Sequence, residues 1–80
     1  MIKLSIHTAS DMAKRGILLY YIEAALADPE WTERDPQPGL TRSFRSIAEF
    51  GGRYLRVVHR QDGDDIFVVT AHWDRGAKKL

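Results

Sequence analysis

The chain contains no cysteine, only three prolines and no apolar run long enough to cross a bilayer. Without cysteine there can be no disulfide and no thiolate zinc site, a composition that favours a reducing compartment. The longest apolar stretch, residues 17–27, is interrupted by Glu23 and is shorter than the roughly 20 residues that a transmembrane helix needs. The N-terminal residues are too few and too polar for a signal peptide. We therefore expect a soluble, cytoplasmic protein that does not associate with membranes.

Neither sign of charge dominates, since the formal net charge is +1, but the charges are unevenly distributed. Residues 1–40 carry four basic and six acidic side chains, whereas residues 41–80 carry eight basic and five acidic ones. A local cluster of arginines favours phosphate binding. The alternative is a solvated sheet face on which arginine stems cover apolar surface. The clustered side chains are Arg42, Arg45, Arg53, Arg56 and Arg60.

The length and composition predict a single globular domain over residues 1–80, since 44% of the residues are hydrophobic and 29% are charged. Residues 74–80 are typical of a frayed basic tail.

Residues 52–60 and 66–73 are rich in β-branched and aromatic side chains and flank an Asp/Gly cluster, which predicts a β-hairpin. We expect Val57 opposite Val69 and Leu55 opposite Ala71, because the other parity would bury arginines against aromatic rings. The apolar side, which we call the back face, would carry Leu55, Val57, Phe67, Val69, Ala71 and Trp73. The other side, the front face, would carry Tyr54, Arg56, Val58, Arg60, Thr70 and His72.

The remaining elements follow from hydrophobic periodicity and from capping residues. Residues 2–7 alternate as a strand would, with Lys3 and His7 toward the front face. Helices are expected over residues 10–15, capped by Thr8 or Ser10, and over residues 18–27. A short edge strand over 31–34 and a strand over 41–50 complete the order. The sequence thus predicts an α+β fold, β-α-α-β-β-β, with two helices packed on one face of a twisted, mainly antiparallel sheet.

Four motifs resemble a bacterial family of small proteins that is grouped with the RelE/ParE and BrnT toxins of type II toxin–antitoxin systems. They are H-x-x-x-x-M-x-x-R-G-I over residues 7–17, A-L-x-D/N-P over 25–29, G-R-x-L-R-V-V over 52–58 and V-V-T-A-x-W-D-R over 68–75. The chain departs from the family where Asp11 replaces a frequent arginine, Leu18 a capping serine and His72 a tyrosine. The change at Asp11 weakens any role of the first helix in RNA binding.

The resemblance implies a RelE-like fold and a small acidic antitoxin that covers the active face. RelE-type members cut messenger RNA without a metal, usually on the ribosome, whereas ParE-type members act on DNA gyrase. Two function classes therefore stay open: a metal-independent endoribonuclease, and a non-catalytic module whose basic sheet face binds an acidic partner protein. Gyrase inhibition is a third, and homo-oligomer formation is also left open.

Metal-free RNA cleavage needs a base for the 2′-hydroxyl, cations for the charged phosphorane and an acid for the leaving 5′-oxygen. We expect Arg56 at the scissile phosphate, because a guanidinium holds two phosphate oxygens and stays charged. His72 is the expected acid or base, with His7 and Tyr54 as the other catalytic candidates. The expected RNA-binding residues are Arg45, Arg53, Arg60 and Arg75.

Each catalytic candidate also has a structural interpretation. His72 could only cap the sheet end, His7 could bond the start of the first helix, and Tyr54 could pack at the sheet rim. His59 is expected on the back face with a structural role. No cofactor is expected, and no metal site, because strand alternation separates His59 from His72.

Overall fold

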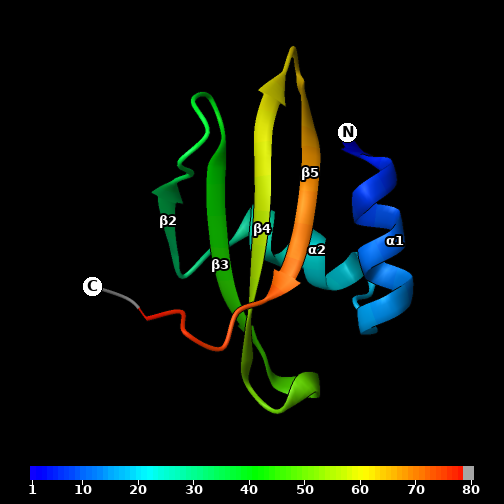
Figure 1. Ribbon diagram of the computed structural model, residues 1–80, viewed down its shortest axis with the longest axis vertical. Coiled ribbons are helices and arrows are strands. Elements are labelled where there is room, and N and C mark those ends of the chain that lie inside the picture. Colours follow the sequence, from blue (N-terminus) through cyan, green and yellow to red (C-terminus); the bar gives the residue numbers. More distant parts are fainter. Residues whose placement is uncertain (79–80) are drawn as a thin grey trace.

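The computed structural model describes residues 1–78, which form two α-helices and five strands (Figure 1). The elements are β1 (Ile2–Leu4), α1 (Ile6–Arg15), α2 (Leu19–Ala27), β2 (Trp31–Arg34), β3 (Thr41–Ile47), a 3₁₀ turn (Ala48–Phe50), β4 (Arg53–Asp62) and β5 (Asp65–Trp73). This is the predicted α+β order, and the expected edge strand is present as β2.

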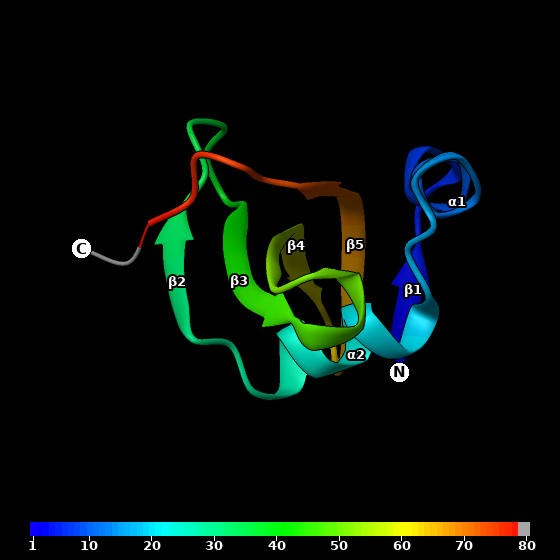
Figure 2. The same ribbon diagram turned by 90° about the horizontal axis from the view of Figure 1, so that it is seen from below.

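The five strands form one open sheet in the order β1-β5-β4-β3-β2. All neighbouring strands are antiparallel except β1, which runs parallel to β5. α2 packs behind β3 and β4, whereas α1 lies beside β5 at the β1 edge of the sheet (Figures 1 and 2). The predicted architecture, two helices on a mainly antiparallel sheet, is confirmed. No helix within the described residues is both long and apolar enough to span a membrane.

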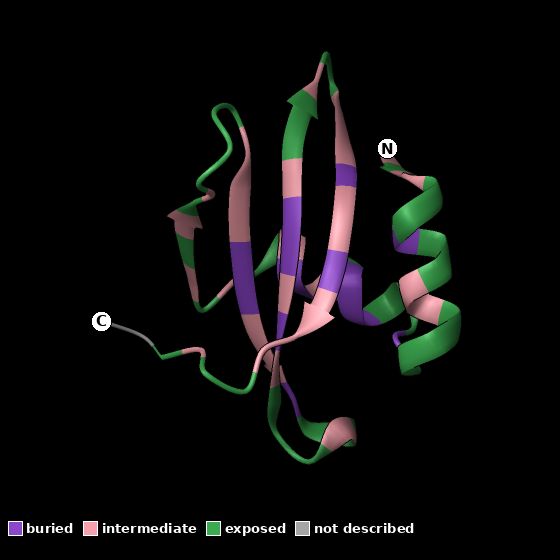
Figure 3. Ribbon diagram, viewed as in Figure 1, coloured by how far each residue is buried: buried purple, intermediate pink, exposed green. Residues whose placement is uncertain are grey.

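The core lies between the back face of the sheet and α2, and Met12 of α1 packs against it (Figure 3). α2 contributes Tyr21, Ile22 and Ala25, which are buried on one side of the helix. It ends at Asp28, because a residue before proline avoids the helical conformation. The strands contribute the fully buried Leu55, Val57, Val68 and Ala71.

The register of the hairpin differs from the prediction by two residues and contains a bulge. Leu55 pairs with Trp73 and Val57 with Ala71, so the predicted parity holds in this half. Between Val58 and His59 the register shifts, and His59 pairs with Val68. A bulge adds one residue to one strand, so it reverses the alternation beyond it.

The bulge corrects the predicted back face at two positions. Val68, fully buried, takes the core position that was expected for Val69. Phe67 pairs with Arg60 and lies on the front face, with the guanidinium 4.8 Å from its ring centroid. Alternation alone could not show this, because a bulge depends on the neighbouring elements.

The N-terminal elements are a second correction. The first strand ends at Leu4, and α1 begins at Ile6 rather than at Ser10, so His7 is an exposed helical residue instead of a front-face strand residue. The cap is Ser5, whose Oγ accepts from the backbone N–H of Thr8 at 3.0 Å. Gly16 ends the helix in the left-handed conformation, as predicted (φ 67°).

The strand expected over residues 41–50 also ends early. β3 stops at Ile47, and a 3₁₀ turn leads into the Gly51-Gly52 reversal. Phe44 and Ile47 lie on opposite faces: Ile47 joins the core, while Phe44 stacks on Trp31 with ring centroids 4.6 Å apart.

Candidate functional site

Arg56 and His72 pair directly across β4 and β5, so their side chains share the front face, the side of the sheet away from α2 (Figure 2). α1 reaches this face beside β5, where Asp11 contacts Thr70. They line a cleft of about 340 Å³ together with Arg42 of β3 and Thr70 of β5. The loop between β2 and β3 closes one side of this cleft with Asp35, Pro36, Gln37 and Leu40. The two residues expected to lead the chemistry are therefore neighbours in one concave site.

A hydrogen-bond chain holds the His72 ring. The Thr70 hydroxyl donates to Asp11 Oδ2 at 2.9 Å and lies 2.8 Å from His72 Nε2. Because the single hydroxyl proton goes to Asp11, Nε2 must carry a proton and donate to Thr70. Nδ1 is then left with its lone pair, and it has no hydrogen-bond partner among residues 1–78.

The electrostatics of this chain favour a neutral His72. Burial lowers its pKa below the ordinary 6.5; Asp11 opposes this by raising the pKa, and Arg56 lowers it further. Burial by itself would raise the pKa of Asp11, but the hydrogen bond from Thr70 and the nearby cations outweigh burial, and the pKa lies below 3.8. An ionised Asp11 thus orients a neutral imidazole that can accept a proton at Nδ1.

The two arginines of the cleft already contact carboxylates. Arg42 Nε donates to Asp35 at 2.8 Å, and this contact lowers the pKa of Asp35. Arg56 Nη1 lies 3.3 Å from Asp74 Oδ2. Arg56 Nε is buried and has no hydrogen-bond partner within the described chain. Arg56 therefore keeps unused donor capacity next to the cleft.

The other catalytic candidates lie outside this hydrogen-bond chain. Tyr54 is on the front face two residues before Arg56, and its ring packs edge-on against Trp31 at 5.2 Å. His7 projects from the first turn of α1, and no described contact links it to the cleft. His59 is half-buried on the back face, as expected, with Nε2 2.7 Å from Ser43 Oγ, and burial lowers its pKa.

The predicted RNA-binding arginines divide into three groups. Arg45 pairs with Leu55 and so faces the back, where it donates to the carbonyl of Asp28 at the end of α2. Arg60 lies at the far end of β4, near the acidic tip of the hairpin. Arg53 and Arg75 line a second hollow near the start of β4.

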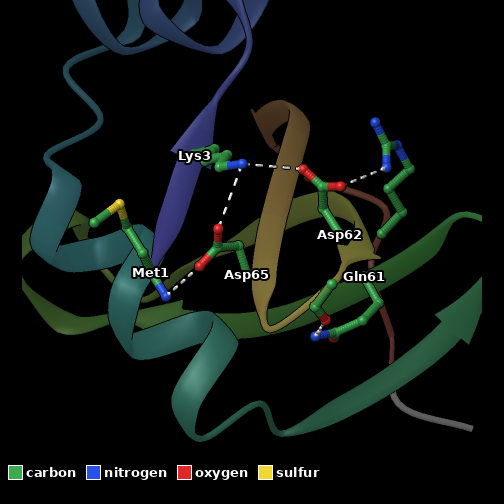
Figure 4. Close-up of polar contacts among 7 residues, drawn as sticks. Met1, Lys3, Gln61, Asp62 and Asp65 are labelled. Atoms are coloured by element: carbon green, nitrogen blue, oxygen red, sulfur yellow. Dashed lines mark hydrogen bonds and ion pairs between the residues drawn. The ribbon is translucent and has the colours of Figure 1, made fainter.

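The hairpin tip is held by ion pairs rather than left as an open basic surface. Lys3 bridges Asp62 and Asp65 at 3.3 and 3.4 Å (Figure 4). Asp62 also lies 3.9 Å from Arg60. Arg60 is therefore partly neutralised and lies apart from the Arg56–His72 pair.

The sequence interpretation missed Asp11 and Thr70 as site residues. Strand alternation predicts Thr70 on the front face, but nothing local marks it as a partner of His72. Asp11 is 59 positions from Thr70, and only the docking of α1 on β5 brings them together. Within residues 1–78, no group of three or more His, Asp or Glu side chains is placed to hold a metal ion.

The fold and the site define an α+β domain with an arginine- and histidine-bearing cleft on the sheet face away from α2. Residues 4–73 match the protein family described as Domain of unknown function (DUF4258), and the chain belongs to this family. No curated protein and no solved structure matches the chain. The family description names neither a toxin nor an activity, so a function has to be argued from the cleft itself.

Proposed function

We propose that this protein is a metal-independent endoribonuclease that cuts messenger RNA, as a toxin of a type II toxin–antitoxin system would. The observation that carries the proposal is the Asp11–Thr70–His72 chain, which presents a neutral ring nitrogen beside the Arg56 guanidinium. A neutral base and a fixed cation on one concave surface are two of the three groups that the reaction requires.

In the proposed reaction, His72 Nδ1 takes the proton of the ribose 2′-hydroxyl. The 2′-oxygen then attacks the adjacent phosphorus, and the bond from phosphorus to the 5′-oxygen breaks. Arg56 stabilises the charge on the phosphorane, for which its planar fork is suited. Tyr54, two residues away on the same face, is the candidate that protonates the leaving oxygen.

The test is cleavage of a labelled RNA by the purified protein, freed of any partner. Arg56→Ala should lower the rate roughly 10²–10³-fold, since it removes a preorganised charge. His72→Gln should lower it about 10²-fold or more. A chelator should leave the rate unchanged, because no step uses a metal. Arg34→Ala is the matched control, since Arg34 is exposed on β2 and has no carboxylate partner in residues 1–78.

A second candidate function is a non-catalytic module that binds an acidic protein through the same face. The observation in its favour is that both arginines of the cleft already hold carboxylates of this chain, Asp35 and Asp74. Intact RNA after incubation with folded, partner-free protein would reject the nuclease and leave this module.

A further inference from the structure

A second hollow, of about 290 Å³, adjoins the cleft at the Arg56–Asp74 ion pair. Its walls are the Gly51-Gly52 turn, the first residues of β4 and the segment that follows β5. That segment leaves β5, passes the ends of β4 and β3, and continues toward β2 (Figures 1 and 2). The side chains that give the hollow its chemistry are Arg53, Tyr54, Trp73 and Arg75.

The hollow carries positive charge that no ion pair within residues 1–78 neutralises. Five arginines contact carboxylates: Arg15, Arg42, Arg45, Arg56 and Arg60. Arg53 and Arg75, by contrast, have no ion pair among residues 1–78. Among residues 1–78, the one carboxylate that lines the hollow is Asp74, and it is already engaged. Its Oδ2 faces Arg56 at 3.3 Å, and its Oδ1 accepts from the Gly76 N–H at 3.0 Å.

The surrounding contacts position both arginines. The Arg53 guanidinium lies 5.9 Å from the centroid of Phe50, whose ring stacks on Trp73 at 4.2 Å. Arg75 follows Asp74 in the short turn that the Gly76 hydrogen bond closes. Two guanidinium groups at one hollow are suited to an anion with several oxygens, such as a phosphodiester.

We propose that this hollow binds the phosphate of a nucleotide next to the one that is cleaved, so that the substrate is single-stranded RNA longer than one nucleotide. The inference rests on the proposed function, because it takes the scissile phosphate to lie at Arg56. The two sites meet at the Arg56–Asp74 ion pair, and Arg75 follows Asp74 directly, so a short stretch of linked nucleotides can span them. Arg53, an odd number of residues before Arg56, approaches the hollow from the other side of β4. The Tyr54 ring, which lines the hollow, offers a face for a base or ribose, as in other single-strand sites.

The test is binding of oligodeoxynucleotides of one to four nucleotides, which lack the 2′-hydroxyl and cannot be cleaved. Affinity should rise once the oligonucleotide is long enough to reach both sites. Arg53→Gln and Arg75→Gln should each lower the affinity for the longer probes about tenfold, the effect of one lost charged hydrogen bond. Each should also reduce the slope of log affinity against log salt by about one. Both should leave the shortest probe unaffected, and Arg34→Gln should match the wild type at every length.

The outcomes separate this inference from the proposed function. Equal affinity of the wild type and both variants for every length, or no oligonucleotide binding at all, overturns the second subsite. A length effect that both variants abolish, in a protein that leaves RNA intact, supports the subsite and rejects the nuclease. RNA cleavage by the wild type with unchanged KM in both variants supports the nuclease and overturns the subsite. Both arginines are exposed, and circular dichroism of each variant verifies that it folds.

Discussion

Asp11 shows how much one side chain in this chain depends on its distant partners. In the family that the sequence resembles, this position often carries arginine, and the change predicts weaker RNA binding by the first helix. In the structure Asp11 accepts a hydrogen bond from Thr70 and lies near His72. The sequence marks Asp11 only as the loss of a positive charge. In the structure its carboxylate accepts the hydrogen bond from Thr70, and Thr70 in turn orients the candidate base His72.

The pH dependence of cleavage tests this role. Protonation of His72 removes the base, so the rate should fall as the pH drops through the pKa of His72, which burial places below 6.5. The Asp11 carboxylate raises that pKa. Asp11→Asn therefore lowers it further, and the acidic limb of the pH–rate profile should move to lower pH. An amide can still accept from Thr70, so the plateau rate should change little.

Thr70→Val is the companion variant, because it removes the hydroxyl between the two residues while Asp11 keeps its charge. The rate at the plateau should fall about tenfold or more through loss of ring orientation. A limb that stays fixed in Asp11→Asn, or moves to higher pH, would contradict the assigned role of Asp11.

The site residues could be predicted from sequence only as far as strand alternation reaches. Arg56 and His72 were placed on one face because period-two patterning sorts a hairpin, and the structure pairs them. Arg45 was grouped with the RNA-binding arginines, yet it faces the back and contacts the end of α2. The local sequence does not show which way Arg45 points, since that depends on how β3 pairs with β4.

Among the elements, the β5 bulge and the start of α1 form one unit. The carbonyl of Val68 accepts from the Ser5 N–H at 2.9 Å and from the Thr8 hydroxyl at 3.1 Å. The carbonyl of Val69 accepts from the Ser5 hydroxyl at 2.6 Å. The bulge leaves Val69 without a partner residue on β4, and the Ser5 hydroxyl of the helix cap satisfies its carbonyl. This explains why the helix starts at residue 6 although the alternation of residues 2–7 is typical of a strand.

Ser5→Ala should therefore destabilise the protein more than the loss of a cap alone. It removes the acceptor for the Thr8 N–H and leaves the Val69 carbonyl without its donor. We expect the free energy of unfolding to fall by about 1–3 kcal/mol. Ser10→Ala is the matched control: Ser10 is exposed on the same helix, and its replacement should change stability by less than about 0.5 kcal/mol.

Chemical denaturation of both variants measures these changes. Equal stability of the two would show that the cap and bulge do not act together. The comparison also tests the observed cap, Ser5, against Ser10, which the sequence predicts as one of two possible caps.

For the whole molecule, the charge distribution is more balanced than the arginine count suggests. The cleft arginines are paired with Asp35 and Asp74, and the hairpin tip carries its own acidic residues. A ligand of the front face must therefore compete with carboxylates of the chain. Phosphates and acidic side chains both satisfy this requirement, so the same face suits RNA and an acidic antitoxin.

If an antitoxin covers this face, its binding and RNA binding should exclude each other. We expect the acidic product of an adjacent reading frame to co-purify with this protein and to block oligonucleotide binding. Its association rate should fall steeply as salt is raised, because electrostatic steering acts mainly on encounter. Arg42→Gln and Arg56→Gln should weaken the complex, whereas Arg34→Gln should not. Stopped-flow association at several salt concentrations measures this. A complex that forms equally well with all three variants, or one that still binds RNA, would place the partner on a different surface.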